Sequence, residues 1–251
     1  MGEEDLRNEM ELMKEEGQRA GGGPGGRERG PRRPRTHSRL TERDRAIAEW
    51  IERVGVAGVD DVARRFGVGR VVTYRRLAAL CETGWIRSWR PFAEAGVWYP
   101  AGAKRPKVRE LNHQLSVVAL VVDLERAGEK VITEREMRQD DVIAVDTAQR
   151  WSIELSALRS STALERPTHR PDFAVQREHE LEAFELELSQ KSRARLERLL
   201  GAWARQGRYG QVRYLCASGA IARAVQVASE RAGAGRVARV EQVDVGARVA
   251  L

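Results

Sequence analysis

The chain has 251 residues, a formal net charge of +7 and a pI of about 9.9. This charge favours a polyanionic partner, and the lack of an apolar run of about 18 residues argues against a membrane-spanning helix. The two cysteines, Cys81 and Cys216, lie far apart in apolar contexts, which argues against a disulfide framework and fits the cytoplasm.

Residues 1–38 carry few side chains that a folded core could bury. Residues 21–38 consist mainly of Gly, Pro and Arg, a composition typical of disordered segments. We therefore expect a disordered tail and basic linker over residues 1–38. The basic part could contact the DNA backbone or could be a solvated spacer, and the sequence leaves both open.

Residues 39–104 predict a small domain with three helices followed by a strand hairpin. A helix is expected from Thr41, a good N-cap whose capping-box partner is Asp44. The other elements are expected at Asp60–Phe66 and Arg70–Thr83 for helices, and at Trp85–Arg90 and Val97–Pro100 for strands. This order resembles a winged helix-turn-helix.

The third of these helices is the expected contact with double-stranded DNA. Three of its positions, Thr73, Leu77 and Leu80, recur at helical spacing and should face the core. Side chains near the N-terminal end of the opposite face would then be free to reach a major groove, as in recognition helices. They are Arg70, Tyr74 and Arg75. The alternative is that this unit serves only for packing or dimerisation.

Residues 109–247 alternate between helix and strand patterns, which predicts an α/β layer with a mixed central sheet. The first helix carries an apolar stripe with His113 beside it, either as a site residue or as a buried, hydrogen-bonded imidazole. Glu134 follows as an accessory acidic candidate. Later elements are expected at Trp151–Leu155, Gln211–Ala217, Ile221–Ala232 and Val237–Val245.

The most informative pattern lies between residues 167 and 203. A strand entering at Pro171 and Asp172 is followed by a polar turn and a second strand, in which Glu185 and Glu187 alternate with apolar residues. The alternation of period two places both glutamates on one face. Three carboxylates at one end of a hairpin suit a hard cation such as Mg²⁺. The alternative is a strand face that simply points into water.

A helix is expected from about Gln190 to Gln206. Ser189 could cap it, and Lys191 would lie on its first turn. The positive end of that helix would then point toward the carboxylates and toward any phosphate bound there.

Taken together, Asp172, Glu185, Glu187 and Lys191 resemble a variant of the PD-(D/E)xK nuclease core. With His169-Arg-Pro-Asp172 and Leu111-Asn-His113-Gln-Leu-Ser-Val117, the chain is similar to the replication-relaxation family of bacterial proteins, linked to plasmid replication and mobilisation. The usual lysine position, two residues after the acidic one, holds Glu187 here.

The resemblance implies a role for each residue of the motif. The implied Mg²⁺ ligands are Asp172, Glu185 and Glu187; the implied catalytic residues are Glu187 and Lys191; the implied accessory residues are His113, Glu134 and His169. The implied partners are double-stranded DNA and a relaxase or replication protein.

Three functions remain open from the sequence: a metal-dependent endonuclease or nickase, a non-catalytic DNA-binding regulator, and a relaxase accessory protein. A homodimer is also open. A relaxase itself is not supported, because the four histidines are scattered, and neither a phosphate-binding loop nor zinc-ligand spacing is present.

Overall fold

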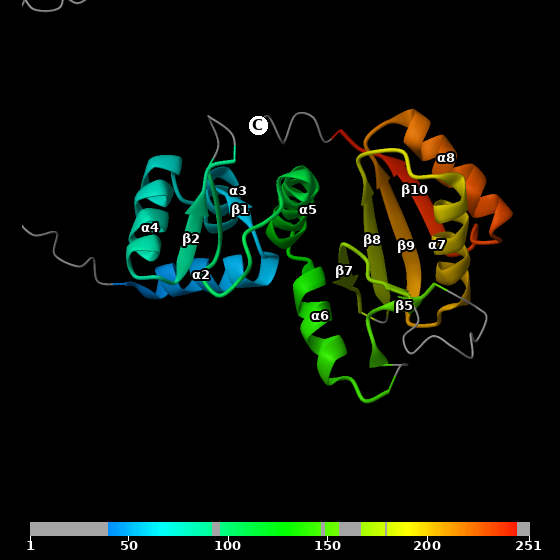
Figure 1. Ribbon diagram of the computed structural model, residues 1–251, viewed down its shortest axis with the longest axis horizontal. Helices are drawn as coiled ribbons and strands as arrows, with labels where there is room; N and C mark the ends of the chain where they lie inside the picture. The colour runs from blue at the N-terminus through cyan, green and yellow to red at the C-terminus, as the bar shows by residue number, and fades with distance from the viewer. Residues whose placement is uncertain (1–39, 92–95, 147–148, 156–166, 179, 245–251) are drawn as a thin grey trace, which may run out of the picture. The chain divides into compact units, whose positions relative to one another are not determined.

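The computed structural model describes residues 40–91, 96–146, 149–155, 167–178 and 180–244 (Figure 1). These residues adopt a mixed α/β fold, as predicted, with seven α-helices and a mixed five-stranded sheet. The predicted tail at 1–38, residues 92–95 between the two strands of the predicted hairpin, and the end of the last predicted strand at Val245 lie outside the described residues. Within them, no helix is long and apolar enough to cross a membrane.

The N-terminal part contains three helices and a small antiparallel sheet. Its elements are α2 (Glu42–Val54), β1 (Ala57–Gly58), α3 (Val59–Phe66), α4 (Arg70–Glu82), β2 (Ile86–Trp89) and β3 (Val97–Pro100), with strand order β1-β3-β2. The predicted capping box is confirmed, since Thr41 Oγ1 accepts from the Asp44 amide at 3.3 Å and the Asp44 carboxylate accepts from the Thr41 amide at 2.7 Å. The two-residue strand β1 was not predicted.

The larger sheet has the strand order β10-β9-β8-β7-β4. Strands β8, β9 and β10 run parallel, whereas β7 pairs antiparallel with both β8 and β4. The strands of this sheet are β4 (Lys130–Thr133), β7 (Phe173–Gln176), β8 (Leu181–Glu187), β9 (Tyr209–Cys216) and β10 (Ala238–Gln242). The remaining elements are α5 (Val108–Arg126), α6 (Glu134–Ile143), β5 (Ile153–Glu154), β6 (Thr168–His169), α7 (Arg193–Arg205) and α8 (Gly219–Arg231).

Helices cover both faces of the large sheet (Figure 1). On one face, Ala183 and Tyr214 pack with Leu200 and Trp203 of α7 and with Val225 of α8. On the other face, side chains of β7 and β8 pack with Val121 of α5. Alternate residues of β8 therefore enter two different cores, which is why its sequence alternates with period two.

Helix α5 belongs to two cores at once. Its Val118 and Val122 are buried among the helices α2, α3 and α4, whereas Val121 is buried against the large sheet. A helix that is apolar on more than one side is expected to lie between two packed layers.

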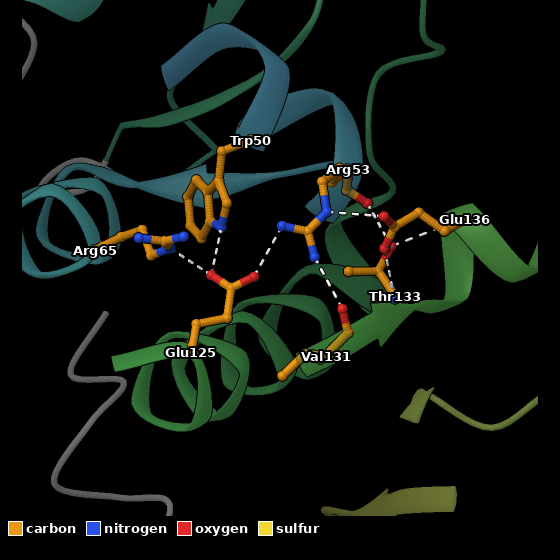
Figure 2. Close-up of polar contacts among 7 residues, drawn as sticks. All are labelled: Trp50, Arg53, Arg65, Glu125, Val131, Thr133 and Glu136. Carbon is orange, nitrogen blue, oxygen red and sulfur yellow. Dashed lines mark hydrogen bonds and ion pairs between the residues drawn. The ribbon is translucent and has the colours of Figure 1, made fainter. Parts of the chain in front are cut away.

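A polar junction reinforces this packing (Figure 2). The Glu125 carboxylate at the end of α5 accepts hydrogen bonds from Trp50 Nε1 at 2.9 Å, from Arg53 Nη1 at 2.9 Å and from Arg65 Nε at 2.5 Å. Arg53 also donates to Glu136 of α6 at 2.9 Å. The N-terminal helices are thus tied to α5 and α6 through side chains that are partly shielded from water.

Candidate functional site

The two glutamates of β8 lie on one face of the strand, as the alternation predicted. Phe184 and Leu186 join the core beneath α5, so Glu185 and Glu187 share the opposite face, which α7 and α8 cover. Each glutamate is only 2% exposed. The alternative of a strand face pointing into water is therefore wrong for these two side chains.

Asp172 reaches the same strand from the other arm of the hairpin. It precedes β7, and its amide donates to the Phe184 carbonyl at 3.0 Å. Its Oδ2 accepts from the Leu186 amide at 2.7 Å, and His113 Nε2 of α5 lies 3.3 Å from the same oxygen. The carboxylate of Asp172 is thus fixed at the end of the antiparallel pair that the sequence predicted.

Each of the two buried glutamates has a cationic or imidazole partner from within the chain. His169 Nε2 of β6 lies 2.5 Å from Glu185 Oε1, and Lys191 Nζ donates to Glu187 Oε1 at 2.5 Å. Together with the contact of His113 to Asp172, these make three pairs in one region, which we call the acidic cluster: Asp172, Glu185 and Glu187 with His113, His169 and Lys191. The fold brings six of the predicted site residues together.

The predicted helix start at Gln190 with a Ser189 cap is wrong. Helix α7 begins at Arg193, with Ser192 in the N-cap position. The apolar stripe of α7 starts only at Leu196, so no packing requires an earlier start. Lys191 therefore lies two residues before the helix, in the segment that leaves β8, where its ammonium reaches back to the strand.

Glu134 does not join the acidic cluster. It is the first residue of α6, where its carboxylate accepts from Arg138 Nη2 at 2.5 Å on an exposed surface. It shares the lining of one cavity with Asp172 and His113. The side chain is therefore near the cluster's open side, without a direct contact to the buried glutamates.

Electrostatics within the acidic cluster follow from burial and from the close approach of like charges. Burial raises the pKa of Glu187; Lys191 lowers it in part, and the neighbouring carboxylates of Glu185 and Asp172 raise it again. Burial is the largest effect on His113 and lowers its pKa. The hydrogen bond and charge of Asp172, with the Leu186 carbonyl 3.1 Å from Nε2, together outweigh burial and bring the pKa to about 9. His169 follows the same pattern with Glu185, and its pKa is raised.

Two further residues beside the cluster were not predicted. In the parallel pairing of β8 with β9, Tyr214 stands opposite Glu185 and Cys216 opposite Glu187. Burial, with the charge of Glu187, raises the pKa of the Cys216 thiol to about 12. The Tyr214 hydroxyl is buried with no hydrogen-bond partner among the described residues. Only the register of β8 against β9 reveals these neighbours.

The residue types of the cluster fit a hard divalent cation, since carboxylate oxygens are the ligands that Mg²⁺ prefers. The charges of Glu185 and Asp172 raise the pKa of Glu187 because like charges repel. A bound cation would relieve this repulsion. As the described side chains stand, however, no three His, Cys, Asp or Glu residues are arranged around one point to hold a metal ion. A cation would have to replace the internal partners His169 and Lys191.

The outward face of α4 carries the residues predicted to contact DNA. Thr73, Leu77 and Leu80 are buried, as predicted, whereas the side chains of Arg70, Tyr74 and Arg75 are exposed. Tyr74 is 44% exposed, and its hydroxyl accepts from Arg90 Nη2 at 2.7 Å.

The neighbours of Tyr74 and Arg75 on α4 differ in what they contact. Arg70 lies 3.3 Å from the Asp60 carboxylate, in an exposed pair. Arg76 turns inward, and its Nε donates to the buried Asp44 at 2.6 Å. Arg76 is therefore a structural residue, and Arg75 is the arginine of this turn that faces solvent.

Comparisons of the chain with protein-family models, with curated proteins and with solved structures found no match.

Proposed function

We propose that the chain binds double-stranded DNA through α4, in the manner of a winged helix-turn-helix. The observation that carries this proposal is the division of α4 into two faces. Thr73, Leu77 and Leu80 are buried, whereas Tyr74 and Arg75 face solvent near the helix N-terminus. Recognition helices present the residues of their N-terminal part to base edges in the major groove.

The contact between Tyr74 and Arg90 supports this proposal. The hydrogen bond of 2.7 Å joins α4 to the chain just beyond β2, and the Tyr74 ring packs edge-on against Trp98 of β3 at 5.7 Å. Held in this way, the Tyr74 ring keeps the Arg90 side chain beside α4. Arg75 follows Tyr74 in the sequence, and arginines at positions 75 and 90 suit contacts to bases and phosphates.

Titration of labelled duplex DNA into the full chain and into Arg75→Ala tests the proposal. A bidentate base contact by Arg75 is worth about 1–3 kcal/mol, so the Kd should rise roughly 5- to 150-fold. Arg195→Ala on α7 is a matched control, because Arg195 is also an exposed helical arginine. Equal binding by wild type and Arg75→Ala across a range of salt concentrations would refute the assignment.

A second candidate function is Mg²⁺-dependent cleavage or nicking of DNA at the acidic cluster. The observation that favours it is the convergence of Asp172, Glu185 and Glu187 from two strands. Asp172 and Glu185 would hold the ion, and Glu187 would contact it directly or through water. When bound, such an ion would activate water and stabilise the charge that builds on a phosphodiester.

The residues around the cluster suit the same chemistry. Lys191 follows β8, and its ammonium pairs with the Glu187 carboxylate. The ammonium could exchange that carboxylate for a phosphate oxygen. His113 and His169 hold Asp172 and Glu185 in fixed positions. With the internal pairs kept intact, the same residues make a neutralised, non-catalytic scaffold, which is the alternative function.

Two measurements separate cleavage from the scaffold. Supercoiled plasmid incubated with the protein and Mg²⁺ or Mn²⁺ should give open-circular or linear product, and Asp172→Ala should not. Calorimetry with Mn²⁺ should show binding to the wild type and weaker binding to Asp172→Ala and Glu185→Ala. If the wild type binds no metal, the scaffold function is the correct one.

The resemblance to the replication-relaxation family supports a role in the replication or mobilisation of a plasmid or other mobile element. In that role the protein acts in the bacterial cytoplasm, and a relaxase or replication protein is its proposed partner. Co-purification with a relaxase encoded on the same element is the direct test.

A further inference from the structure

A cavity of about 460 Å³ opens beside the acidic cluster. Its walls come from α5, from the start of α6, from the residues after α2 and from the segment 103–107. Asp172 and His113 form part of the lining, so the cavity meets the cluster on the side away from the buried glutamates. A volume of this size lies within the range of ligand-binding pockets in proteins.

Basic side chains outnumber acidic ones around this cavity. The basic residues of the lining are Lys104, Arg105, Lys107, Arg135 and Arg138, and the acidic ones are Glu110, Glu134 and Asp172. Walls of low dielectric concentrate the field of such an excess. The cavity therefore favours an anion.

Two polar atoms of the lining are buried without a hydrogen-bond partner among the described residues. They are the Nε of Arg135, whose Nη2 pairs with Glu52, and the Oε1 of Gln114. A buried polar atom without a hydrogen-bond partner costs about 1–3 kcal/mol, so each of the two atoms favours a ligand that supplies the missing partner. A phosphate oxygen would accept from Arg135 Nε, and a base amino group or a water molecule could donate to Gln114.

The acidic residues at the edge of the cavity do not block an anion. Glu134 pairs with Arg138, and Glu110 pairs with Lys107, and all four side chains are between 44% and 65% exposed. Exposed ion pairs contribute only about 0–1 kcal/mol, so exchanging one carboxylate for a phosphate costs little. Lys104 is exposed, and no ion pair to it is observed among the described residues.

We propose that this cavity binds the phosphate backbone of a single DNA strand, with phosphates against Lys104 and Arg135 and the strand passing beside Asp172. The proposal rests on the proposed function, and it names the form of DNA that this second site takes. The major groove of a duplex is by itself about 12 Å wide. The whole duplex is therefore too broad to enter a cavity of about 460 Å³. One or two nucleotide units suit a cavity of about 460 Å³.

Fluorescence anisotropy with labelled oligo(dT) of about 12 nucleotides tests the proposal, since single-strand sites commonly span about 4–16 nucleotides. The full chain is titrated in the presence of a chelator, so that cleavage cannot consume the probe. Lys104→Ala and Arg135→Ala should each bind the probe several-fold more weakly. The slope of log Kd against log salt should fall by about 0.7 for each phosphate that a variant no longer binds.

The control and the competitor decide between the alternatives. Arg195→Ala should bind oligo(dT) like the wild type, and thymidine monophosphate should compete far less well than unlabelled oligo(dT). Unchanged binding by both Lys104→Ala and Arg135→Ala would overturn the proposal. Equal competition by the monophosphate would also overturn it, because the cavity would then be a mononucleotide site. Lys104 is exposed in a loop, so Lys104→Ala tests the contact without loss of packing.

Failure of this proposal is distinguishable from failure of the proposed function. If Arg75→Ala weakens duplex binding while Lys104→Ala and Arg135→Ala both leave oligo(dT) binding unchanged, α4 binds DNA and the cavity proposal is wrong. If Lys104→Ala weakens oligo(dT) binding while Arg75→Ala leaves duplex binding unchanged, the cavity proposal stands and the function assigned to α4 fails.

Discussion

Replacement of Glu125 with Ala should destabilise the whole fold, because one carboxylate serves three donors from the N-terminal helices (Figure 2). Its side chain is only 6% exposed. Loss of the acceptor leaves the buried Trp50 Nε1 unsatisfied, at a cost of about 1–3 kcal/mol. Arg53 and Arg65 are about one-third exposed, so water replaces part of the hydrogen bonding that they lose with the carboxylate. Each lost pair therefore adds about 0.5 kcal/mol to the destabilisation.

The expected total is a loss of about 2–4 kcal/mol in the free energy of unfolding, which in a protein of this size lowers the Tm by about 4–16 °C. Differential scanning calorimetry measures both quantities. Glu197→Ala is the matched control, since Glu197 also pairs with two arginines, Arg193 and Arg231, but on the surface. The Tm of this control should stay close to that of the wild type. A Glu125→Ala protein that melts within about 2 °C of the wild type would refute the reasoning.

Two further predictions concern the sheet. Phe173 is fully buried and stacks on Phe184 with ring centroids 4.6 Å apart. Phe173→Ala should therefore lower the free energy of unfolding, measured with urea, by about 3–5 kcal/mol. A decrease below about 1 kcal/mol would contradict this packing. Burial lowers the pKa of His113, but the hydrogen bond and charge of Asp172 together with the Leu186 carbonyl raise it to about 9, above the ordinary 6.5. These contacts therefore stabilise the fold fully below pH 6.5 and lose their effect as the pH rises through 9. Urea titrations from pH 6 to 10 should show this decline in the wild type and a smaller one in His113→Gln, and equal declines would contradict it.

Local signals in the sequence were sufficient for most of the architecture. The capping box of Thr41 and Asp44 marked the start of α2, and the alternation around Glu185 and Glu187 predicted both the strand β8 and its two faces. Such signals depend on side chains a few residues apart.

What could not be predicted depends on distant contacts. The sequence named His169 as an accessory residue, but not its contact with Glu185. It belongs to β6, whose partner is β5, and only the folded chain brings its imidazole to that carboxylate. The position of Tyr214 depends on the register of β9 against β8, two parallel strands that a helix separates in the sequence. Helix α6 was missed because most of its length is polar, and it is held by its capping box and by the buried Met137.

Because α5 contributes side chains to two cores, it affects how the protein unfolds. A fragment that starts at residue 109 would leave Val118 and Val122 open to water, and a fragment that ends at residue 104 would lose the helix that covers α2 and α3. Unfolding of either part should therefore remove the support of the other. We expect a single cooperative transition from Leu40 onward, so that a protease acting in the segment 103–107 should yield fragments that do not persist separately.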